Sequence, residues 1–157
     1  MGQSLVNVFR LVSGVGQGGI LSPVFFNIYI DCVIDKITDL DIGCYFRGFF
    51  SGIWLYADDI ILLSASVSGL QHMIDACILE LENVDLAVNI LKTKCMRIGR
   101  RYKAIDTPVA INGSSIQWCN QLSYLGMVFT TSAIFKCNLH ENKANFFRAA
   151  NSILSRV

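Results

Sequence analysis

This sequence has few charged residues. It also has no long uninterrupted apolar run. Only 16% of the 157 residues are charged, whereas 53% are hydrophobic, and the mean hydropathy is +0.48. A chain this apolar is not intrinsically disordered. Asp58 and Asp59 interrupt its most hydrophobic stretch, so no segment has the apolar length that a membrane helix needs. We therefore expect a folded domain with no membrane partner, whose surplus apolar surface is covered by further sequence.

The cysteine and histidine spacings of a zinc site are also missing. The six cysteines include no Cys-x-x-Cys pair, and the two histidines are isolated. Scattered cysteines of this kind favour reduced, packed thiols in an intracellular protein. We find no secretory or myristoylation signal, and nothing in the sequence distinguishes nucleus from cytoplasm.

A basic segment stands out although the net charge is only +1. Six of the 13 cations lie within twelve residues that contain no acid. These six are Lys92, Lys94, Arg97, Arg100, Arg101 and Lys103. Such a segment is typical either of a surface that binds nucleic acid or of a solvated charge run beside a strand, and composition leaves both open.

The central stretch runs from Ile53 to Leu63 and places two adjacent acids inside an apolar run. Its period predicts two short strands, 53–57 and 60–64, with Asp58 and Asp59 together at the turn of a hairpin. Adjacent carboxylates between core-forming residues fit a Mg²⁺ site, because Mg²⁺ takes one or two carboxylates and fills its remaining positions with water and phosphate oxygens. Asp-Asp is also a common turn dipeptide with no ligand at all.

A glycine-rich loop, 14–19, precedes a predicted helix that begins at Ser22 and Pro23 and runs to about Thr38. Serine suits the cap of a helix and proline its first turn. Glycines before a helix N-terminus allow the backbone to approach an anion such as phosphate. Gln17 has no core to join within this loop, which favours contact with a ligand over a merely flexible connection.

The remaining elements follow from period and turn residues. A capping box at 68–71 predicts a helix with one apolar stripe to Val84 that packs on the sheet, with His72 solvated. Asn112-Gly113 predicts a hairpin within 109–117. Further strands are expected at 4–13, 44–46, 95–99 and 122–129, and a final helix is expected to be capped by Asn138 and Glu141.

Four motifs occur in a fixed order along the chain. They are the loop and helix start at 14–23 with Phe25-Phe26-Asn27, the tetrad Tyr56-Ala57-Asp58-Asp59, the segment Asn89 to Lys94, and Tyr124-Leu125-Gly126. In this order they resemble the palm of a reverse transcriptase, most closely that of the non-LTR retrotransposon (LINE-like) branch. The resemblance runs from about Phe9 to Phe129.

The resemblance implies roles around the two acids. Asp58 would bind the two catalytic Mg²⁺ ions, for which Mn²⁺ can substitute, and Asp59 would be its less directly coordinating neighbour. Tyr56 and Ala57 would lie near the primer terminus. Lys92 would lie near the leaving phosphates.

The resemblance also implies contacts with RNA template, DNA primer and deoxynucleoside triphosphates. The residues expected at the template and nucleotide are Gly16, Gln17, Gly18 and Gly19. Those expected to form a hairpin that grips the primer are Tyr124, Leu125 and Gly126. Those expected along the nucleic-acid backbone are Lys94, Arg97, Arg100 and Arg101.

Three departures from the family pattern qualify these expectations. Only thirteen residues precede Gly14, with no acid among them, whereas the family carries a strand with the first catalytic aspartate there, and fingers before it. Asp85 stands where a glycine is usual, and Gly16 stands where an arginine is frequent. We therefore expect an α+β, palm-type antiparallel sheet with packed helices that lacks the fingers and the first catalytic strand.

The expected organisation is a partial palm over 1–130 and the helical start of a thumb over 131–157. The implied activity is RNA-templated DNA synthesis by a two-magnesium mechanism as part of a retrotransposon polyprotein, and we expect the isolated chain to be inactive. The alternatives are a residual nucleic-acid-binding module and a non-functional partial reading frame.

Overall fold

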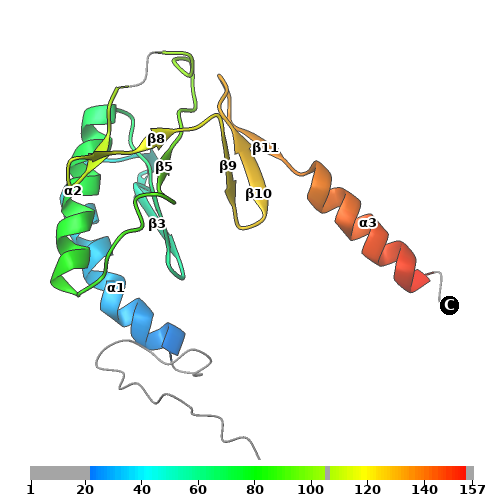
Figure 1. Cartoon of the computed structure of the whole chain (residues 1–157), viewed down its shortest axis with the longest axis horizontal. Helices are drawn as coiled ribbons and strands as arrows, with labels where there is room; N and C mark the ends of the chain where they lie inside the picture. Colours follow the sequence, from blue (N-terminus) through cyan, green and yellow to red (C-terminus); the bar gives the residue numbers. More distant parts are fainter. Residues whose placement is uncertain (1–21, 105–106, 155–157) are drawn as a thin grey trace, which may run out of the picture. The chain divides into compact units, whose positions relative to one another are not determined.

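The computed structural model describes residues 22–104 and 107–154, which form a mixed α+β structure. In chain order the elements are α1 (Ser22–Asp39), β1 (Tyr45–Phe46), β2 (Phe49–Phe50), β3 (Ile53–Tyr56), β4 (Asp59–Leu62), α2 (Val67–Asn83), β5 (Lys94–Cys95), β6 (Ala110–Ile111), β7 (Ser114–Ser115), β8 (Gln117–Trp118), β9 (Gln121–Tyr124), β10 (Met127–Thr130), β11 (Lys136–Asn138) and α3 (His140–Leu154) (Figure 1). They belong to two compact units, one ending at Leu86 and the other beginning at Ala87. The α+β class predicted from the sequence is confirmed.

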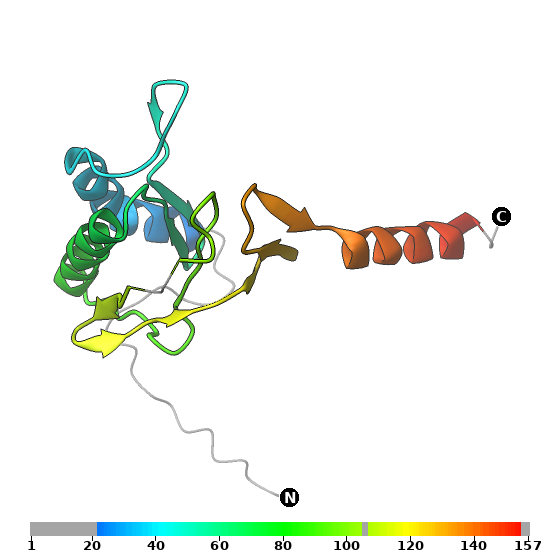
Figure 2. The same ribbon diagram turned by 90° about the horizontal axis from the view of Figure 1, so that it is seen from above.

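In the first unit, α1 and α2 lie side by side in both views (Figures 1 and 2). The stripe on α1 buries Ile30, Val33 and Ile37, which are spaced as one helix face requires. The facing stripe of α2 buries Met73, Ile74, Cys77, Ile78 and Leu81. The predicted stripe is therefore confirmed, but α2 packs chiefly on α1 and only secondarily on β4.

The predicted start of α2 was wrong by two residues. Ser66, in an extended conformation, is the N-cap, and its hydroxyl accepts a 3.0 Å hydrogen bond from the Gly69 amide. Ser68 lies inside the first turn of the helix, and the Gln71 side chain donates to Asp75. Both serines precede a helical pattern, but only the backbone conformation at Ser66 leaves its side chain free to cap.

The end of α2 explains one departure from the family pattern. Asp85 has φ +56°, in the left-handed region, and the Leu86 amide donates to the Leu81 carbonyl at 2.8 Å. A glycine adopts this conformation without strain, and an aspartate tolerates it better than most other residues. His72 is exposed on this helix, as predicted.

The second unit is built from short strands and one helix. β5 pairs with β8 in parallel, β6 pairs with β7, and β9, β10 and β11 form an antiparallel sheet. The Asn112-Gly113 hairpin is confirmed, with φ values of +48° and +79°. The predicted strand 95–99 was wrong, because only Lys94 and Cys95 find a pairing partner in β8.

The single strand that the period predicted over 122–129 was also wrong, whereas the hairpin that the family resemblance implied at Tyr124, Leu125 and Gly126 is confirmed. Leu125 and Gly126 both have positive φ, at +48° and +73°, and fold the segment into the β9–β10 hairpin. Apolar alternation runs through both strands, so the period alone did not reveal the turn.

The last helix, α3, begins beside Asn138, whose side-chain oxygen accepts a 2.9 Å hydrogen bond from the His140 amide. Asn138 therefore satisfies one amide at the helix start as predicted, whereas the Glu141 side chain lies outside the described residues. Among the helices that the structure describes, none combines the length and apolarity needed to cross a membrane.

Candidate functional site

The β3–β4 hairpin carries the two acids. Alternating apolar residues pair in antiparallel register, with Leu55 opposite Ile60 and Tyr56 opposite Asp59. This register leaves Ala57 and Asp58 as a two-residue loop, and Ala57 has φ +51°. Two-residue loops match the twist of paired strands when a central residue has positive φ. The prediction of acids at a hairpin turn is confirmed, with one refinement: Asp59 is the first residue of β4.

The hairpin has two unlike faces. Residues directly opposite one another share a face, so Tyr56 and Asp59 lie together, with Trp54 two positions along on the same side. Trp54 and Tyr56 are 57% and 60% exposed. The Trp54 indole is held by a 3.1 Å hydrogen bond from its Nε1 to the Ser51 carbonyl. The other face carries aliphatic residues, and the unit's helices contact both strands.

The carboxylates of Asp58 and Asp59 are both exposed at this tip. Within residues 22–104 and 107–154, no three His, Cys, Asp or Glu side chains gather closely enough to hold a metal ion. The site therefore offers two adjacent carboxylates and no third acidic ligand from the described part of the chain. Mg²⁺ commonly binds through one or two carboxylates and completes its shell with water and substrate phosphate.

In the second unit, Lys92 lies in a turn closed by Asn89. The Lys92 amide donates to the Asn89 side-chain oxygen at 3.2 Å, and the Thr93 hydroxyl donates to the Asn89 carbonyl at 3.0 Å. These bonds fix the backbone and leave the Lys92 ammonium exposed. Lys94 follows as the first residue of β5 and is also exposed.

The remaining basic residues differ in their surroundings. The Arg97 guanidinium lies over the Trp118 ring, 4.6 Å from its centroid, and donates to the Ala104 carbonyl at 2.7 Å. Arg100 and Arg101 are exposed. The Arg97 guanidinium is thus engaged within the unit, whereas the Arg100 and Arg101 side chains are exposed and can contact a polyanion.

At the tip of the β9–β10 hairpin, Tyr124 ends β9 and is half-buried, whereas Leu125 is 49% exposed in the turn. The segment predicted to grip a primer is therefore a tight hairpin end.

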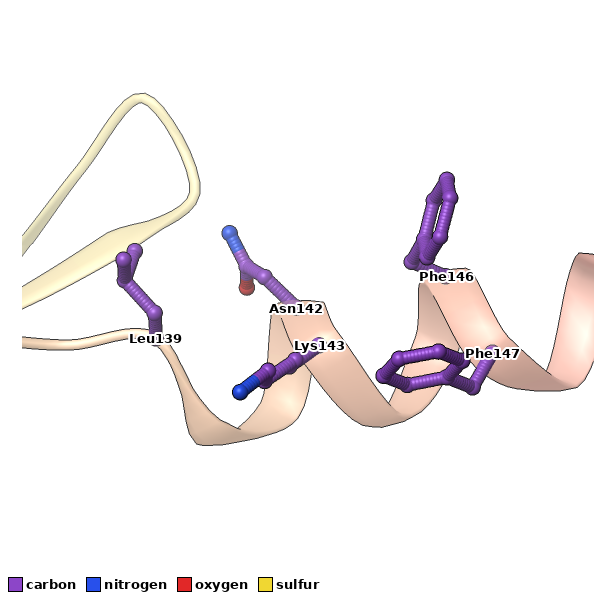
Figure 3. Close-up of a pocket in the computed structure, with 5 residues that line it drawn as sticks. All are labelled: Leu139, Asn142, Lys143, Phe146 and Phe147. Atoms are coloured by element: carbon purple, nitrogen blue, oxygen red, sulfur yellow. The ribbon is translucent and has the colours of Figure 1, made fainter.

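A hollow of about 460 Å³ lies along α3 and is lined by Leu139, Asn142, Lys143, Phe146 and Phe147. Figure 3 shows these side chains projecting from the helix and the residue before it. The hollow contains no acid, so it offers a metal no carboxylate and is a surface feature of α3.

A family model described as reverse transcriptase (RNA-dependent DNA polymerase) matches residues 2–129. The chain belongs to the reverse transcriptase family. It is also 27% identical, over 139 residues, to the Retrovirus-related Pol polyprotein from type-2 retrotransposable element R2DM of Drosophila melanogaster. The family match confirms the predicted reverse transcriptase domain, and the similarity to a retrotransposon polyprotein agrees with the predicted non-LTR branch. The alignment covers 82% of this chain and 13% of the polyprotein, so the chain spans a small part of that relative's length.

Within this reverse transcriptase domain, the structure brings Tyr56, Ala57, Asp58 and Asp59 together on one hairpin tip. Lys92 and the primer-grip residues belong to the other unit. The predicted template and nucleotide residues Gly16, Gln17, Gly18 and Gly19 lie outside the described residues, as does the strand predicted at 4–13.

Two features of this reverse transcriptase domain were not predicted from the sequence. One is the interaction of Arg97 with Trp118, because the two lie 21 positions apart in the sequence and no local pattern links them. The other is strand β2, whose partner β1 was predicted; together they form a hairpin with exposed aromatic rings. The Arg47-Gly48 pair between aromatic residues was an available signal, since a glycine at the second turn position favours a two-residue hairpin loop.

Proposed function

We propose that this chain is the palm-type part of a polymerase that synthesises DNA on an RNA template. The observation that most directly supports this proposal is the exposed Asp58-Asp59 pair at the tip of a tight hairpin, in a chain of the reverse transcriptase family. An exposed tip allows a primer terminus and a nucleotide to approach both carboxylates. The relative's printed name, a retrotransposon Pol polyprotein, supports a role within a larger polyprotein.

Asp58 is proposed as the principal ligand of two Mg²⁺ ions, with Asp59 as its neighbour and with Mn²⁺ as a substitute. Carboxylate oxygens are the ligands these hard cations prefer. When bound, two such ions stabilise the attacking and leaving oxygens of a phosphoryl transfer. Tyr56 shares the face of Asp59, which suits a contact with the primer terminus.

The other proposed contacts use exposed or turn residues. Lys92 presents a free ammonium from a fixed turn, which suits a role near the leaving phosphates. Tyr124, Leu125 and Gly126 form a hairpin end proposed to hold the primer. The glycine loop with Gln17 is proposed to contact template and nucleotide.

We further propose that the metal site is incomplete in this chain. No acid precedes Asp31 in the sequence, and the described residues add no third acidic ligand to the hairpin tip. A preceding segment of a longer polypeptide, with fingers and a first catalytic strand, would supply it. Under this proposal the palm corresponds to 1–130 and the start of a thumb to 131–157.

Primer extension on an RNA template tests the proposal. A polypeptide that carries the natural upstream coding sequence is expected to extend a DNA primer, and the 157-residue chain is expected not to. Asp58→Ala in the longer polypeptide should lower the rate by about 10²–10⁴-fold, because a metal site contributes several kcal/mol to the transition state. Asp35→Ala, which removes an exposed acid from α1, is the matched control and should retain activity.

Two results would change this picture. Activity of the 157-residue chain that disappeared with Asp58→Ala would refute the incomplete site while supporting the polymerase. A stop codon directly upstream of Met1 would favour the second candidate, a residual nucleic-acid-binding module. The exposed Lys94, Arg100 and Arg101 favour that module, which would bind nucleic acid in a salt-dependent way and ignore Asp58→Ala.

A further inference from the structure

The β1–β2 hairpin carries two aromatic rings on one outward face. Phe46 pairs directly with Phe49, so both side chains lie on the same side of the hairpin. Their exposed fractions are 66% and 77%. Figure 2 shows this teal hairpin projecting from the two helices of the first unit. Two neighbouring exposed rings form an apolar patch, and contiguous patches of this kind can mark interaction sites.

The opposite face of the same hairpin is anchored. Phe50 lies so close to two glycines that a Cβ atom at Gly52 would come within 2.3 Å of its ring, and one at Gly43 within 2.9 Å. Tyr45 packs edge-on against Phe50 with ring centroids 5.4 Å apart, and its hydroxyl donates to Asp41. The base of the hairpin is therefore fixed by packing, while Phe46 and Phe49 are held outward.

Backbone hydrogen bonds hold the hairpin to the end of the β3–β4 pair. The Ser51 amide donates to the Cys44 carbonyl at 2.8 Å, and the Cys44 amide donates to the Leu63 carbonyl at 3.1 Å. Leu63 directly follows β4, at the end opposite Asp59. At roughly 3.3 Å per residue, the four residues of β4 separate the two ends by about 13 Å. The aromatic face is thus distinct from the acidic tip.

The charge around the rings favours a polyanion. The Arg47 guanidinium lies over the Phe46 ring, with Cζ 5.5 Å from the ring centroid. The sequence from Ile42 to Ala57 contains no aspartate or glutamate. Nucleic-acid bases stack on aromatic rings and on guanidinium planes, and arginine attracts the adjoining phosphates.

We propose that Phe46, Arg47 and Phe49 form a stacking platform for an unpaired strand of nucleic acid. The platform holds bases outside the region where the acidic tip would act. It is independent of the metal site and rests on the proposed function only in that a template strand supplies the ligand. A surface for another protein would need apolar area alone. Asp41 is engaged by the Tyr45 hydroxyl at the base of the hairpin, and the arginine over the Phe46 ring, in a segment from Ile42 to Ala57 without an acid, argues for the polyanion.

Binding of a fluorescein-labelled, single-stranded 15-nucleotide RNA of mixed sequence tests the platform. Fluorescence anisotropy is measured on the 157-residue chain in low salt with EDTA and no nucleotide. Base stacking on an aromatic ring contributes about 1–3 kcal/mol, so Phe46→Ala and Phe49→Ala should each raise Kd by about 5- to 150-fold. Phe49→Trp should retain affinity, whereas Phe49→Leu, which keeps most of the apolar area, should lose it as alanine does.

The controls distinguish a loss of base stacking from a loss of folding, and binding of RNA from binding of a second copy of the chain. Phe147→Ala removes an exposed ring from α3 and should leave Kd unchanged, and circular dichroism melts should show all variants folded. Undetectable binding by the wild type, unchanged Kd in the double alanine variant, or full affinity of Phe49→Leu would each overturn the platform. So would concentration-dependent dimerisation that the double alanine variant abolishes without changing RNA affinity.

The same assay separates this inference from the polymerase proposal. Asp58→Ala should bind the oligonucleotide like the wild type, because the assay contains neither metal nor nucleotide. Primer extension that fails while binding persists counts only against the polymerase. Binding that survives loss of both rings counts only against the platform.

Discussion

At the scale of single residues, Arg97 belongs to the basic segment of the sequence but differs from the exposed cations of that segment in its contacts. Its guanidinium stacks on Trp118 and donates to the Ala104 carbonyl. The Trp118 indole in turn donates to the Thr107 carbonyl at 2.9 Å. These contacts tie together the two ends of the loop that carries Arg100. The role of Arg97 at a nucleic-acid backbone stays a prediction, and its present contacts favour positioning of that loop.

Replacing Arg97 by lysine should therefore lower stability even though the charge is kept. Lysine loses the planar stacking and the fixed donor geometry, and a cation–π contact contributes about 0.5–2 kcal/mol. We expect the midpoint of thermal unfolding to fall in Arg97→Lys. Arg100→Lys, at an exposed position, should leave the midpoint unchanged. Equal midpoints for Arg97→Lys and the wild type would show that the contact with Trp118 contributes nothing.

At the scale of elements, tight hairpins organise much of the described chain. Each hairpin turn has at least one residue with positive φ, and the turn residues differ in how readily they adopt that conformation. The β6–β7 turn uses Asn112 and Gly113, which tolerate this conformation, whereas the β9–β10 turn places Leu125 at φ +48°. A leucine in the left-handed region costs about 1–2 kcal/mol relative to a favourable residue. The proposed primer grip therefore contains a strained position, as functional turns often do.

Leu125→Asn should relieve this strain. Because Leu125 is 49% exposed, little buried area is lost, and we expect the free energy of unfolding in urea to rise by about 0.5–1 kcal/mol. The reverse change at the matching position, Asn112→Leu, should lower it. If Leu125→Asn destabilised the protein, Leu125 would instead be needed for packing.

At the scale of the whole molecule, the main helical core lies between α1 and α2 and includes a thiol. Cys77 is buried in the α2 stripe, and burial raises its pKa from 9.0 to about 11. The folded state therefore keeps this thiol protonated at a pH where the unfolded chain already ionises. The resulting stabilisation is complete below pH 9 and is lost as the pH rises from about 9 to about 11.

Alkaline titration should expose this linkage. The difference in unfolding free energy between wild type and Cys77→Ala should shrink by about 1–3 kcal/mol between pH 8.5 and 11 under reducing conditions. Val33→Ala, which truncates a buried side chain of the same core that cannot ionise, should show no such change. A constant difference for Cys77→Ala across this range would mean that its thiol ionises equally in both states.

Local patterns in the sequence were enough for several elements. The spacing of apolar residues predicted α1 and the buried face of α2, because a helix repeats every 3.6 residues whatever surrounds it. Asn112-Gly113 predicted its hairpin, since both residues accept positive φ. Asp58 and Asp59 were placed at a turn because they interrupt alternating apolar strands.

Other features depended on contacts between distant residues. The strand at 95–99 shortened to two residues because its length is set by its partner β8. The turn within 122–129 depended on the pairing of β9 with β10, which holds Leu125 at a positive φ that leucine by itself disfavours. Which serine caps α2 depended on the backbone at Ser66, and the partner of Arg97 depended on Trp118.

The sequence by itself determined the family of this chain, the class of its fold and the acids at its central turn, since motif order and local periodicity need no partner. Only the tertiary structure decided the strand ends, the unlike surroundings of the basic residues and the outward face of Phe46 and Phe49. Pairing and burial are properties of two segments at once, and neither segment encodes them alone.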